Sequence, residues 1–558
     1  MGVKHFYMWY KKHFSPCVSK IPPDRVDCLA LDLNGLFHLC AQTVFRYGTT
    51  RYLLEQKTTI TSKNHQVLFR EVCEKINRLR AEIRPLKRIV LCVDGVAGLA
   101  KMNQQRQRRF RSGITRDPGA FDPNSFTPGT RLMDHLTKYI DWYLRLCMTT
   151  DPEWQGLEVI LSNEKVPGEG EHKIMRYIRS CPVGEVFCIY GLDADLVMIS
   201  SLLPSHHHLY IAREFDYGTV EYVDIRLFTG FILECLYWGS THGTRSEEFS
   251  RERALQDFVL MSTLVGNDFL PSIPTLTILD GAMDIMLETY RSLGRHLCMI
   301  EENPGGRVEI LLDSLGVFFE RLSVHEHPMI EKKYNSQYAF FPDPLVLQNL
   351  YLENQKNIVH FTKYRQDYYK EKFEKGTFIP DVVHHYLDGI RFVLNYYKYG
   401  MPDWSWHYPY FYAPFLVDFP RAIESYHHPH SFTVGEPAPP FLQLLMVLPE
   451  SSFSLLPQCF QGAVDTGLKP FFPESIEIDL TGKRKEWEGI VLLPMIQVSR
   501  FRSFYEKKLA HLLPSEIKRN IIGKTFVYSY HPTKRFHFSS FYGNILDCPI
   551  LTSVLHLP

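Results

Sequence analysis

The stretch VFCIYGLDAD at residues 186–195 decides the fold, because a short apolar run ends there in two carboxylates. Apolar runs of this length are typical of strands that are covered on both faces of a sheet. Similar runs lie at residues 26–31, 88–93, 157–161 and 208–212. Helical patterns separate the runs, at residues 66–83, 131–148, 171–180 and 251–265. The alternation predicts an α/β fold with a mostly parallel sheet flanked by helices.

The character of the chain changes after about residue 300. The segment EENPGGR at 301–307 is rich in turn residues and predicts a surface loop. Beyond about residue 330 the patterns are helical and very aromatic. We therefore expect an N-terminal domain at 1–300 that carries an acidic metal site, a connecting segment at 301–330, and a second, mainly helical region at 331–558 packed on the first.

Composition and charge exclude some classes of protein. The 558 residues include 62 Lys and Arg, 62 Asp and Glu, and 24 His, so the formal net charge is zero and gives no reason to expect a nucleic-acid or membrane partner. The 12 cysteines form no CxxC pair, which argues against a zinc ribbon. No segment approaches the ~18 apolar residues of a membrane span, and the charged start MGVKHFYMWYKKHF does not resemble a signal peptide. These features predict an intracellular protein without a membrane partner.

Carboxylates follow the predicted strands. In parallel α/β sheets the carboxyl ends of the strands meet at one edge, where ligands bind. Taken singly, each acid also fits a helix cap or a turn. Two further motifs, PGEGEHK and VGNDFLP, add acids that glycines can aim at the same edge. The full set is Asp32, Asp94, Glu169, Glu171, Asp193, Asp195 and Asp268.

The acids predict a divalent metal site. So many carboxylates converging without basic partners would repel one another unless cations were present. Ligation by oxygen alone suits Mg²⁺ or Mn²⁺ rather than zinc. A pair of such ions ~4 Å apart is a common device for in-line phosphoryl displacement.

A cationic stripe is predicted next to the acids. The segment KMNQQRQRRFR at 101–111 contains five cations and no acid. On a helix, Lys101, Gln105, Arg108 and Arg109 share one face. The alternative is a solvated charged face, which would normally carry interleaved acids. Their absence favours a site that binds phosphate.

Aromatic residues are concentrated at 395–412, in NYYKYGMPDWSWHYPYFY. Most of these rings fit core packing, but Trp404 and Trp406 are candidates for stacking on a base. His38 follows Asp32 by six residues and is a further stacking candidate, although a lone histidine is more often structural.

Together these segments resemble the XRN family of 5′→3′ exoribonucleases. The resemblance depends on LDLNGLFH, VDGVAGLAKMNQQRQRRFRS, PGEGEHKIM, YGLDADLVM, LVGNDFLP, WSWHYPYFYAP and DLTGKRKEWEGIVLLP, which occur in the family's order. It implies a PIN-like, flap-nuclease-type core with two Mg²⁺ ions, which Mn²⁺ can replace. It also implies that the acids listed above are the catalytic, metal-binding residues.

The resemblance assigns the remaining site residues. Lys101, Gln105, Arg108 and Arg109 correspond to the family's pocket for a 5′-monophosphate. His38 corresponds to the histidine that stacks on the first base, and either Trp404 or Trp406 to its tryptophan partner. The segment Gly113–Ala120 is shorter than in the family, so we expect the basic helix to end by Pro118. The zinc knuckle and the β-rich C-terminal modules of larger relatives are missing, which predicts an enzyme reduced to the catalytic core.

The predicted function is hydrolysis of single-stranded RNA that carries a 5′-monophosphate, releasing nucleoside 5′-monophosphates, as in RNA and mRNA decay. A structure-specific DNA flap endonuclease and a non-catalytic RNA-binding scaffold are the alternatives. We expect a monomer in the cytoplasm rather than the nucleus, and protein partners are unknown.

Overall fold

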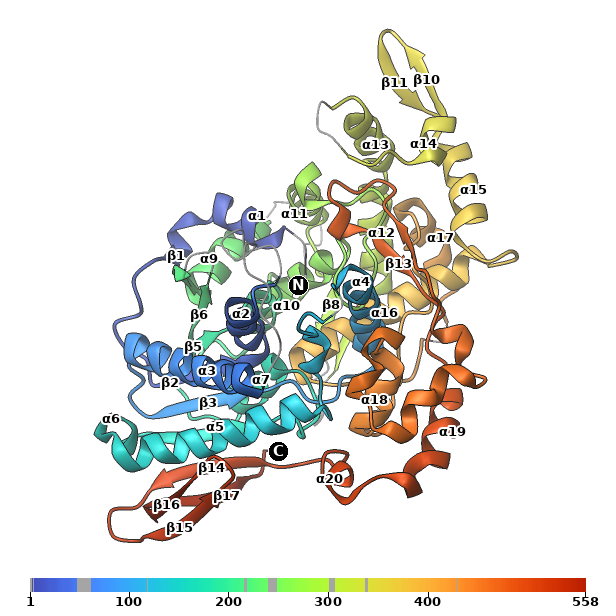
Figure 1. Cartoon of the computed structure of the whole chain (residues 1–558). Helices are drawn as coiled ribbons and strands as arrows, with labels where there is room; N and C mark the ends of the chain where they lie inside the picture. The colour runs from blue at the N-terminus through green and yellow to red at the C-terminus, as the bar shows by residue number, and fades with distance from the viewer. Residues whose placement is uncertain are drawn as a thin grey trace.

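A nine-stranded sheet organises the described part of the chain (Figure 1). The structure is a computed structural model that describes residues 3, 5–47, 62–117, 119–214, 218–238, 248–300, 307–336, 340–427 and 429–557. The strand order is β1-β7-β6-β5-β2-β3-β4-β14-β17. The strands are β1 Val18–Ser19, β2 Cys28–Asp32, β3 Arg88–Cys92, β4 Glu158–Ser162, β5 Val186–Tyr190, β6 His208–Glu214, β7 Val220–Asp224, β14 Thr525–Tyr530 and β17 Ile550–Leu555.

The centre of the sheet, from β6 to β4, is parallel. These are the five predicted strands, and each is confirmed to within two residues at either end. Successive side chains of a strand point to opposite faces. In β2, Leu29 and Leu31 enter one hydrophobic core, and Cys28 and Ala30 enter another. Both faces are therefore buried, which explains the unbroken apolar runs.

Helices cover both faces of the sheet, as predicted. One face packs on α2 (Leu33–Phe45), α3 (Ser62–Ile83) and α5 (Arg131–Thr150). The other face packs on α7 (Gly170–Arg179), α8 (Leu196–Ser201), α9 (Ile225–Leu236) and α10 (Arg251–Thr263). The fold class of a mostly parallel sheet flanked by helices is thereby confirmed.

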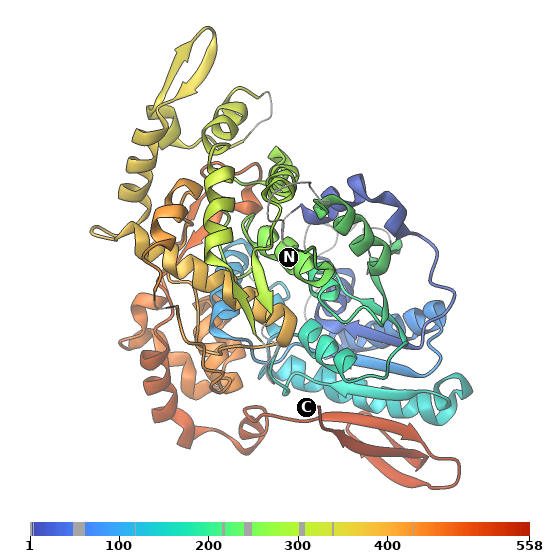
Figure 2. The same ribbon diagram turned by 180° about the vertical axis from the view of Figure 1, so that it is seen from behind.

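The second region packs against the first through two buried helices. α16 (Ile379–Tyr399) joins the core that lies under α7, α8 and α10. α18 (Pro440–Val447) packs against α4 (Leu99–Thr115), and Phe441, Leu445, Met102 and Phe110 belong to the same hydrophobic core. This region also contains α15 Phe361–Lys372 and α19 Val498–Lys508, while α11 Ala282–Leu293, α12 Leu312–Ser323 and α13 Glu326–Tyr334 begin before residue 331. Figure 2 shows this region beside the sheet domain from behind.

The C-terminal residues differ from the expectation of a helical region up to residue 558. They form β14, β15 (Phe536–Ser540), β16 (Gly543–Cys548) and β17. β14 pairs antiparallel with β4, so the end of the chain extends the N-terminal sheet. Both views show these strands beside α5. The free edge of β4 provides the backbone partners that β14 needs, and local helical patterns say nothing about such distant pairing.

The connecting segment expected at 301–330 contains β9 (Val308–Ile310) and α12, while residues 301–306 of the predicted loop lie outside the described residues. α4 ends at Thr115, before Pro118, which also lies outside them. Among the described helices, none combines the length and apolar character that crossing a bilayer requires.

Candidate functional site

Three parallel strands bring four acids to one edge of the sheet. Asp32 is the last residue of β2, Asp94 follows β3, and Asp193 and Asp195 follow β5. β2 lies between β3 and β5. The backbone N–H of Gly170 donates to Asp94 Oδ1 at 2.7 Å, which ties α7 to the same edge. The predicted convergence of these strand ends is therefore present.

The PGEGEHK motif turns two more carboxylates toward this edge. Gly168 has a φ of +100°, which favours glycine, and Glu169 is extended (φ −72°, ψ 148°) just before α7 begins. A Cβ at Gly170 would overlap Asp32 Oδ1, so only glycine lets the two motifs approach this closely. One ligand atom from each of Glu169, Glu171 and His172 lies within 4.8 Å of the others. The expected glycine-relieved turn is confirmed.

A second group of potential ligands overlaps the first. Ligand atoms of Glu171, Asp193 and Asp195 also lie within 4.8 Å of one another, so Glu171 belongs to both groups. Among the described residues, buried oxygen atoms of Asp32, Glu171 and Asp195 have no hydrogen-bond partner. Buried carboxylate oxygens without partners are costly, and an all-oxygen set suits a hard divalent cation. The residues present fit such an ion.

Burial and mutual repulsion raise the pKa of several of these acids. Burial, followed by the charges of Asp94 and Asp193, raises the pKa of Asp32 well above its usual value. Burial and the charge of Asp195 do the same to the pKa of Glu171. Burial and the charge of Asp193 raise the pKa of Asp195 to about 7. We call the full set the acid cluster; its members are Asp32, Asp94, Glu169, Glu171, Asp193, Asp195 and Asp268.

The expectation that the acids lack basic partners is wrong, because Lys101 lies among them. Its Nζ contacts a Glu169 carboxylate oxygen and lies 2.7 Å from Asp268 Oδ2. Burial by itself would lower the pKa of Lys101, but Asp268 and Glu169 raise it well above its usual value. Lys101 therefore lies within the acid cluster, whereas the sequence pattern grouped it with a cationic stripe.

Two tyrosines of α16 complete the surroundings of the acid cluster, a role that was not predicted for them. Tyr396 OH donates to Glu169 Oε1 at 2.7 Å, and Tyr397 OH donates to Asp195 Oδ2 at 3.2 Å. The His172 ring stacks on Tyr396, with centroids 3.8 Å apart. Neither His172 ring nitrogen has a hydrogen-bond partner among the described residues. Adjacent tyrosines inside an apolar helix were the available signal, but the sequence pattern predicts core packing for these rings.

The rest of the cationic stripe lies further along α4. Arg109 is buried and its guanidinium donates to Thr127 Oγ1. Burial and the charge of Arg108 lower the pKa of Arg109 to about 9. Gln105 is buried on the same face, and its carbonyl oxygen has no partner among the described residues. Arg106 points the other way, where it donates to the Met446 carbonyl at 2.9 Å and holds α4 in place.

His38 lies close enough to α4 for the arginines of that helix to affect the pKa of its ring. Burial, followed by the charges of Arg108 and Arg109, lowers the pKa of His38 to about 3, so its ring is neutral. The His38 ring contacts the Phe126 ring edge-on, with the ring centroids 5.0 Å apart.

The two candidate tryptophans have different surroundings. Trp404 is half-buried and its carbonyl accepts from the Leu99 N–H at 2.9 Å, at the start of α4. Trp406 is buried in the core, and its ring stacks on that of Phe392 with the centroids 4.4 Å apart. Trp404 is thus the tryptophan whose backbone contacts the start of α4, whereas Trp406 belongs to the core, and which of the two rings stacks on a base stays a prediction.

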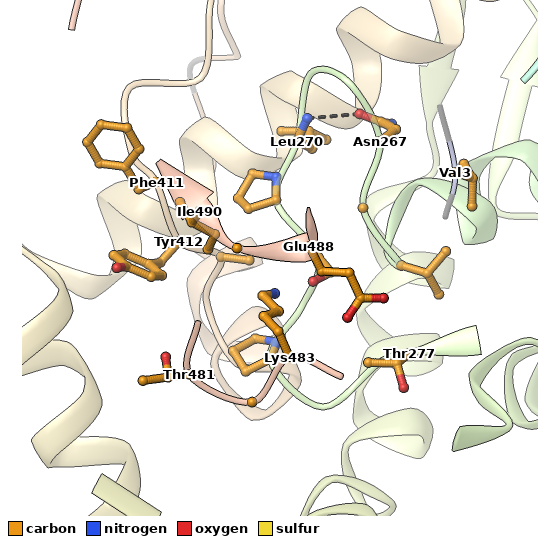
Figure 3. Close-up of a pocket in the computed structure, with 18 of the residues that line it drawn as sticks. Val3, Asn267, Leu270, Thr277, Phe411, Tyr412, Thr481, Lys483, Glu488 and Ile490 are labelled. Carbon is orange, nitrogen blue, oxygen red and sulfur yellow. Dashed lines mark hydrogen bonds between the residues drawn. The ribbon is translucent and has the colours of Figure 1, made fainter. Parts of the chain in front are cut away.

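A cavity of about 930 Å³ adjoins the acid cluster. Asp268 and Arg108 both line it. Figure 3 shows Asn267, the neighbour of Asp268, on one side of the cavity and Tyr412 and Thr481 on the other. The Leu270 N–H donates to Asn267 Oδ1 at 2.8 Å and fixes this wall.

Comparison with known families covers almost the entire chain. The model described as "XRN 5′-3′ exonuclease N-terminus" matches residues 1–118 and 113–215. The model described as "Xrn1 helical domain" matches residues 248–343 and 350–549.

Sequence similarity to individual proteins supports these family matches. The chain is 30% identical to 5′-3′ exoribonuclease 1 of Homo sapiens, over 93% of this chain and 35% of that protein. It is 25% identical to 5′-3′ exoribonuclease 1 of Saccharomyces cerevisiae, over 95% and 45% of the two chains. It is 26% identical to 5′-3′ exoribonuclease 2 of Candida albicans, over 93% and 74%. The chain thus spans less than half the length of the first two relatives.

Among solved structures, the catalytic core of Rad2 in complex with DNA matches 52% of this chain and 69% of that chain, at 14% identity and a TM-score of 0.30. That superposition is loose, and the family assignment depends on the sequence models. Because these models together match both halves of the chain, this protein belongs to the XRN 5′-3′ exonuclease family.

Proposed function

We propose that this protein is a 5′→3′ exoribonuclease that degrades single-stranded RNA with a 5′-monophosphate to nucleoside 5′-monophosphates. The observation that carries the proposal is the position of the acid cluster beside the cationic face of α4. One helix reaches the acids through Lys101 and continues to Arg108 and Arg109. Such an arrangement offers a site for phosphodiester hydrolysis next to a site for a terminal phosphate.

The acid cluster would hold the cations, and we propose that they are two Mg²⁺ ions, with Mn²⁺ as a substitute. The overlap of the two ligand groups at Glu171 supports a pair of ions. When bound, such ions lower the pKa of water and offset the charge that develops on the phosphoryl group.

The chain's own residues would orient the substrate. Arg108 and Arg109 would bind the 5′-phosphate, with Gln105 beside them. The neutral ring of His38 and the ring of Trp404 would stack on the first base. Lys101 would hold Glu169 and Asp268 in place. Every cut leaves a new 5′-phosphate on the shortened RNA, so the same residues can bind it again.

The size of the 5′ end would set the specificity. Arg109 is buried and Thr127, which it contacts, is buried as well, so the end of the pocket leaves little room. A triphosphate or a cap would be too large, and a 5′-hydroxyl would leave the guanidiniums without an anion.

The test compares 5′ ends in the presence of Mg²⁺. Matched RNAs carry a 5′-monophosphate, a 5′-hydroxyl or a 5′-triphosphate, and a DNA flap is included. We expect mononucleotides from the first RNA and no product from Asp193→Ala. Equal rates on all 5′ ends would refute the phosphate pocket. Preferential cutting of the flap would establish a flap endonuclease, and RNA binding without product would establish a scaffold.

A further inference from the structure

The cavity next to the acid cluster reaches a loop that the proposed chemistry does not use. This loop, residues 480–489, joins β12 (Glu477–Asp479) to β13 (Ile490–Leu492). Thr481, Lys483 and Glu488 of the loop line the cavity together with Asp268 and Arg108. The same cavity therefore has the acid cluster and this loop in its walls.

Hydrogen bonds anchor the loop at both ends. The Asp479 carboxylate accepts hydrogen bonds from Lys372 Nζ at 2.5 Å, Tyr412 OH at 2.6 Å and the Thr481 N–H at 2.8 Å. The Glu488 carboxylate accepts from the backbone N–H of Arg484 at 2.8 Å. A group that such a loop presents is preorganised, so binding to it costs little ordering.

Most cations around the loop already have partners. Lys372 pairs with Asp479, and Arg484 Nη2 lies 2.5 Å from Asp280 Oδ1. Lys333 Nζ donates to the Gly482 carbonyl at 2.5 Å. Lys483 differs from these three cations, because its ammonium makes no hydrogen bond or ion pair with the described residues. Figure 3 shows its side chain pointing into the cavity.

The cavity as a whole is rich in cations and aromatic rings. Seven Lys or Arg side chains and four Asp or Glu side chains line it. The cations are Arg108, Arg111, Arg213, Lys333, Lys372, Lys483 and Arg484. Burial lowers the pKa of Lys483 despite the nearby Glu488 and Asp479, so an anion next to it would stabilise its charge. Tyr334, Tyr412 and Trp487 are among the rings in the lining. Cations interleaved with aromatic rings are typical of grooves for single-stranded nucleic acid.

We propose that Lys483, presented by the loop at 480–489, binds a backbone phosphate of single-stranded RNA on the 3′ side of the scissile bond. The inference rests on the proposed function. A strand with its 5′ end at Arg108 and Arg109 has to continue past the acid cluster. The second large cavity, of about 1410 Å³, has no member of the acid cluster in its lining. Because Asp268, Arg108 and Lys483 all line the first cavity, we place the strand in that cavity.

The experiment measures binding of 5′-phosphorylated oligouridines of two to twelve nucleotides in Mg²⁺, in an Asp193→Ala background that prevents cleavage. Lys483→Gln is compared with Lys485→Gln, whose side chain is exposed on the same loop and does not line the cavity. We expect Lys483→Gln to weaken binding of the longer oligomers about ten-fold, the effect of losing a charge-assisted hydrogen bond. Lys485→Gln should not change the affinity, and Lys483→Arg should keep most of it.

Salt dependence gives a second readout. Each phosphate contact on a single strand contributes about 0.7 to the slope of log affinity against log salt concentration. Lys483→Gln should reduce this slope by about that amount for long oligomers alone.

An unchanged slope, or an equal loss for dinucleotides and for the longest oligomers, would overturn the subsite while leaving the proposed function intact. Absence of RNA binding by the Asp193→Ala parent would overturn both.

Discussion

Nζ of Lys101 lies 2.7 Å from Oδ2 of Asp268, and both side chains are more than nine-tenths buried. The same ammonium contacts Glu169, so one lysine offsets charge on two acids that come from different parts of the chain. This internal cation explains how the fold holds so many carboxylates together before any metal binds. It also links the acid cluster to α4, because Lys101 belongs to that helix.

The first prediction concerns the stability of this arrangement. Lys101→Met should lower the free energy of unfolding by about 3 kcal/mol without divalent cations, because breaking a buried ion pair leaves unpaired charges behind. Denaturation in EDTA measures the loss, and Mg²⁺ or Mn²⁺ should restore part of it. Lys138→Met is the control and should cost less than about 1 kcal/mol, since the ammonium of Lys138 is exposed and Asp134 keeps Lys165 as a second partner at 3.3 Å. Equal stability of Lys101→Met and the parent protein would contradict the prediction.

Glu171 is the residue that both potential ligand groups share. Glu171→Gln should therefore weaken Mn²⁺ binding by at least about ten-fold, as measured by calorimetry or electron paramagnetic resonance. In EDTA the same change should raise the stability, because it removes a charge that its neighbours repel. Glu164→Gln is a matched control, since Glu164 is also buried but belongs to neither group. The same loss of Mn²⁺ affinity in both variants would show that burial, rather than ligation, is responsible.

The metal-free protein should lose stability as the pH rises. Asp195 has a pKa of about 7 in the folded state, against about 3.9 in an unfolded chain. The folded state therefore holds a proton that the unfolded state releases, so the free energy of unfolding should fall between about pH 4 and pH 7. Urea denaturation in EDTA at several pH values measures this slope. Asp195→Asn should flatten it, and so should saturating Mg²⁺; a slope of opposite sign would disprove the assignment.

Arg108 should determine discrimination between 5′ ends. Arg108 is exposed, and we expect Arg108→Ala to lower kcat/KM for 5′-monophosphorylated RNA by about 30-fold, because a hydrogen bond to a charged group contributes about 1.5–3 kcal/mol. Activity on 5′-hydroxyl RNA should change much less. Arg502→Ala, an exposed arginine on α19, should have no effect. If Arg108→Ala reduced both activities equally, Arg108 would not belong to the phosphate pocket.

The two tryptophans should respond in opposite ways to truncation. Trp404→Ala should raise KM for RNA by about ten-fold with little change in stability, since a base stacked on an aromatic ring contributes about 1–3 kcal/mol. Trp406→Ala should lower the free energy of unfolding by about 3–5 kcal/mol, because it opens a cavity next to Phe392. Thermal denaturation and steady-state kinetics separate the two effects. A loss of RNA affinity confined to Trp406→Ala would reverse the assignment.

Local patterns in the sequence determined the strands, the helices around them and the carboxylates at the strand ends. The apolar runs report burial on both faces, which is a property of each strand itself. The spacing of Asp32, Asp94 and Asp193 after such runs then places them at one edge, because parallel strands end together. The cationic face of α4 likewise followed from helical periodicity alone.

Only the tertiary structure decided which of these residues meet. Lys101 bonds to Asp268 across 167 residues, and Tyr396 bonds to Glu169 across 227. β14 likewise pairs with β4, a strand far away in the sequence. The stacking of Trp406 on Phe392 depends on how the core packs around both rings. Periodicity shows that a side chain is buried or exposed, but it does not identify the partner. That choice is made when the helices and strands pack, because a buried charge or hydroxyl is stable only next to a complementary group.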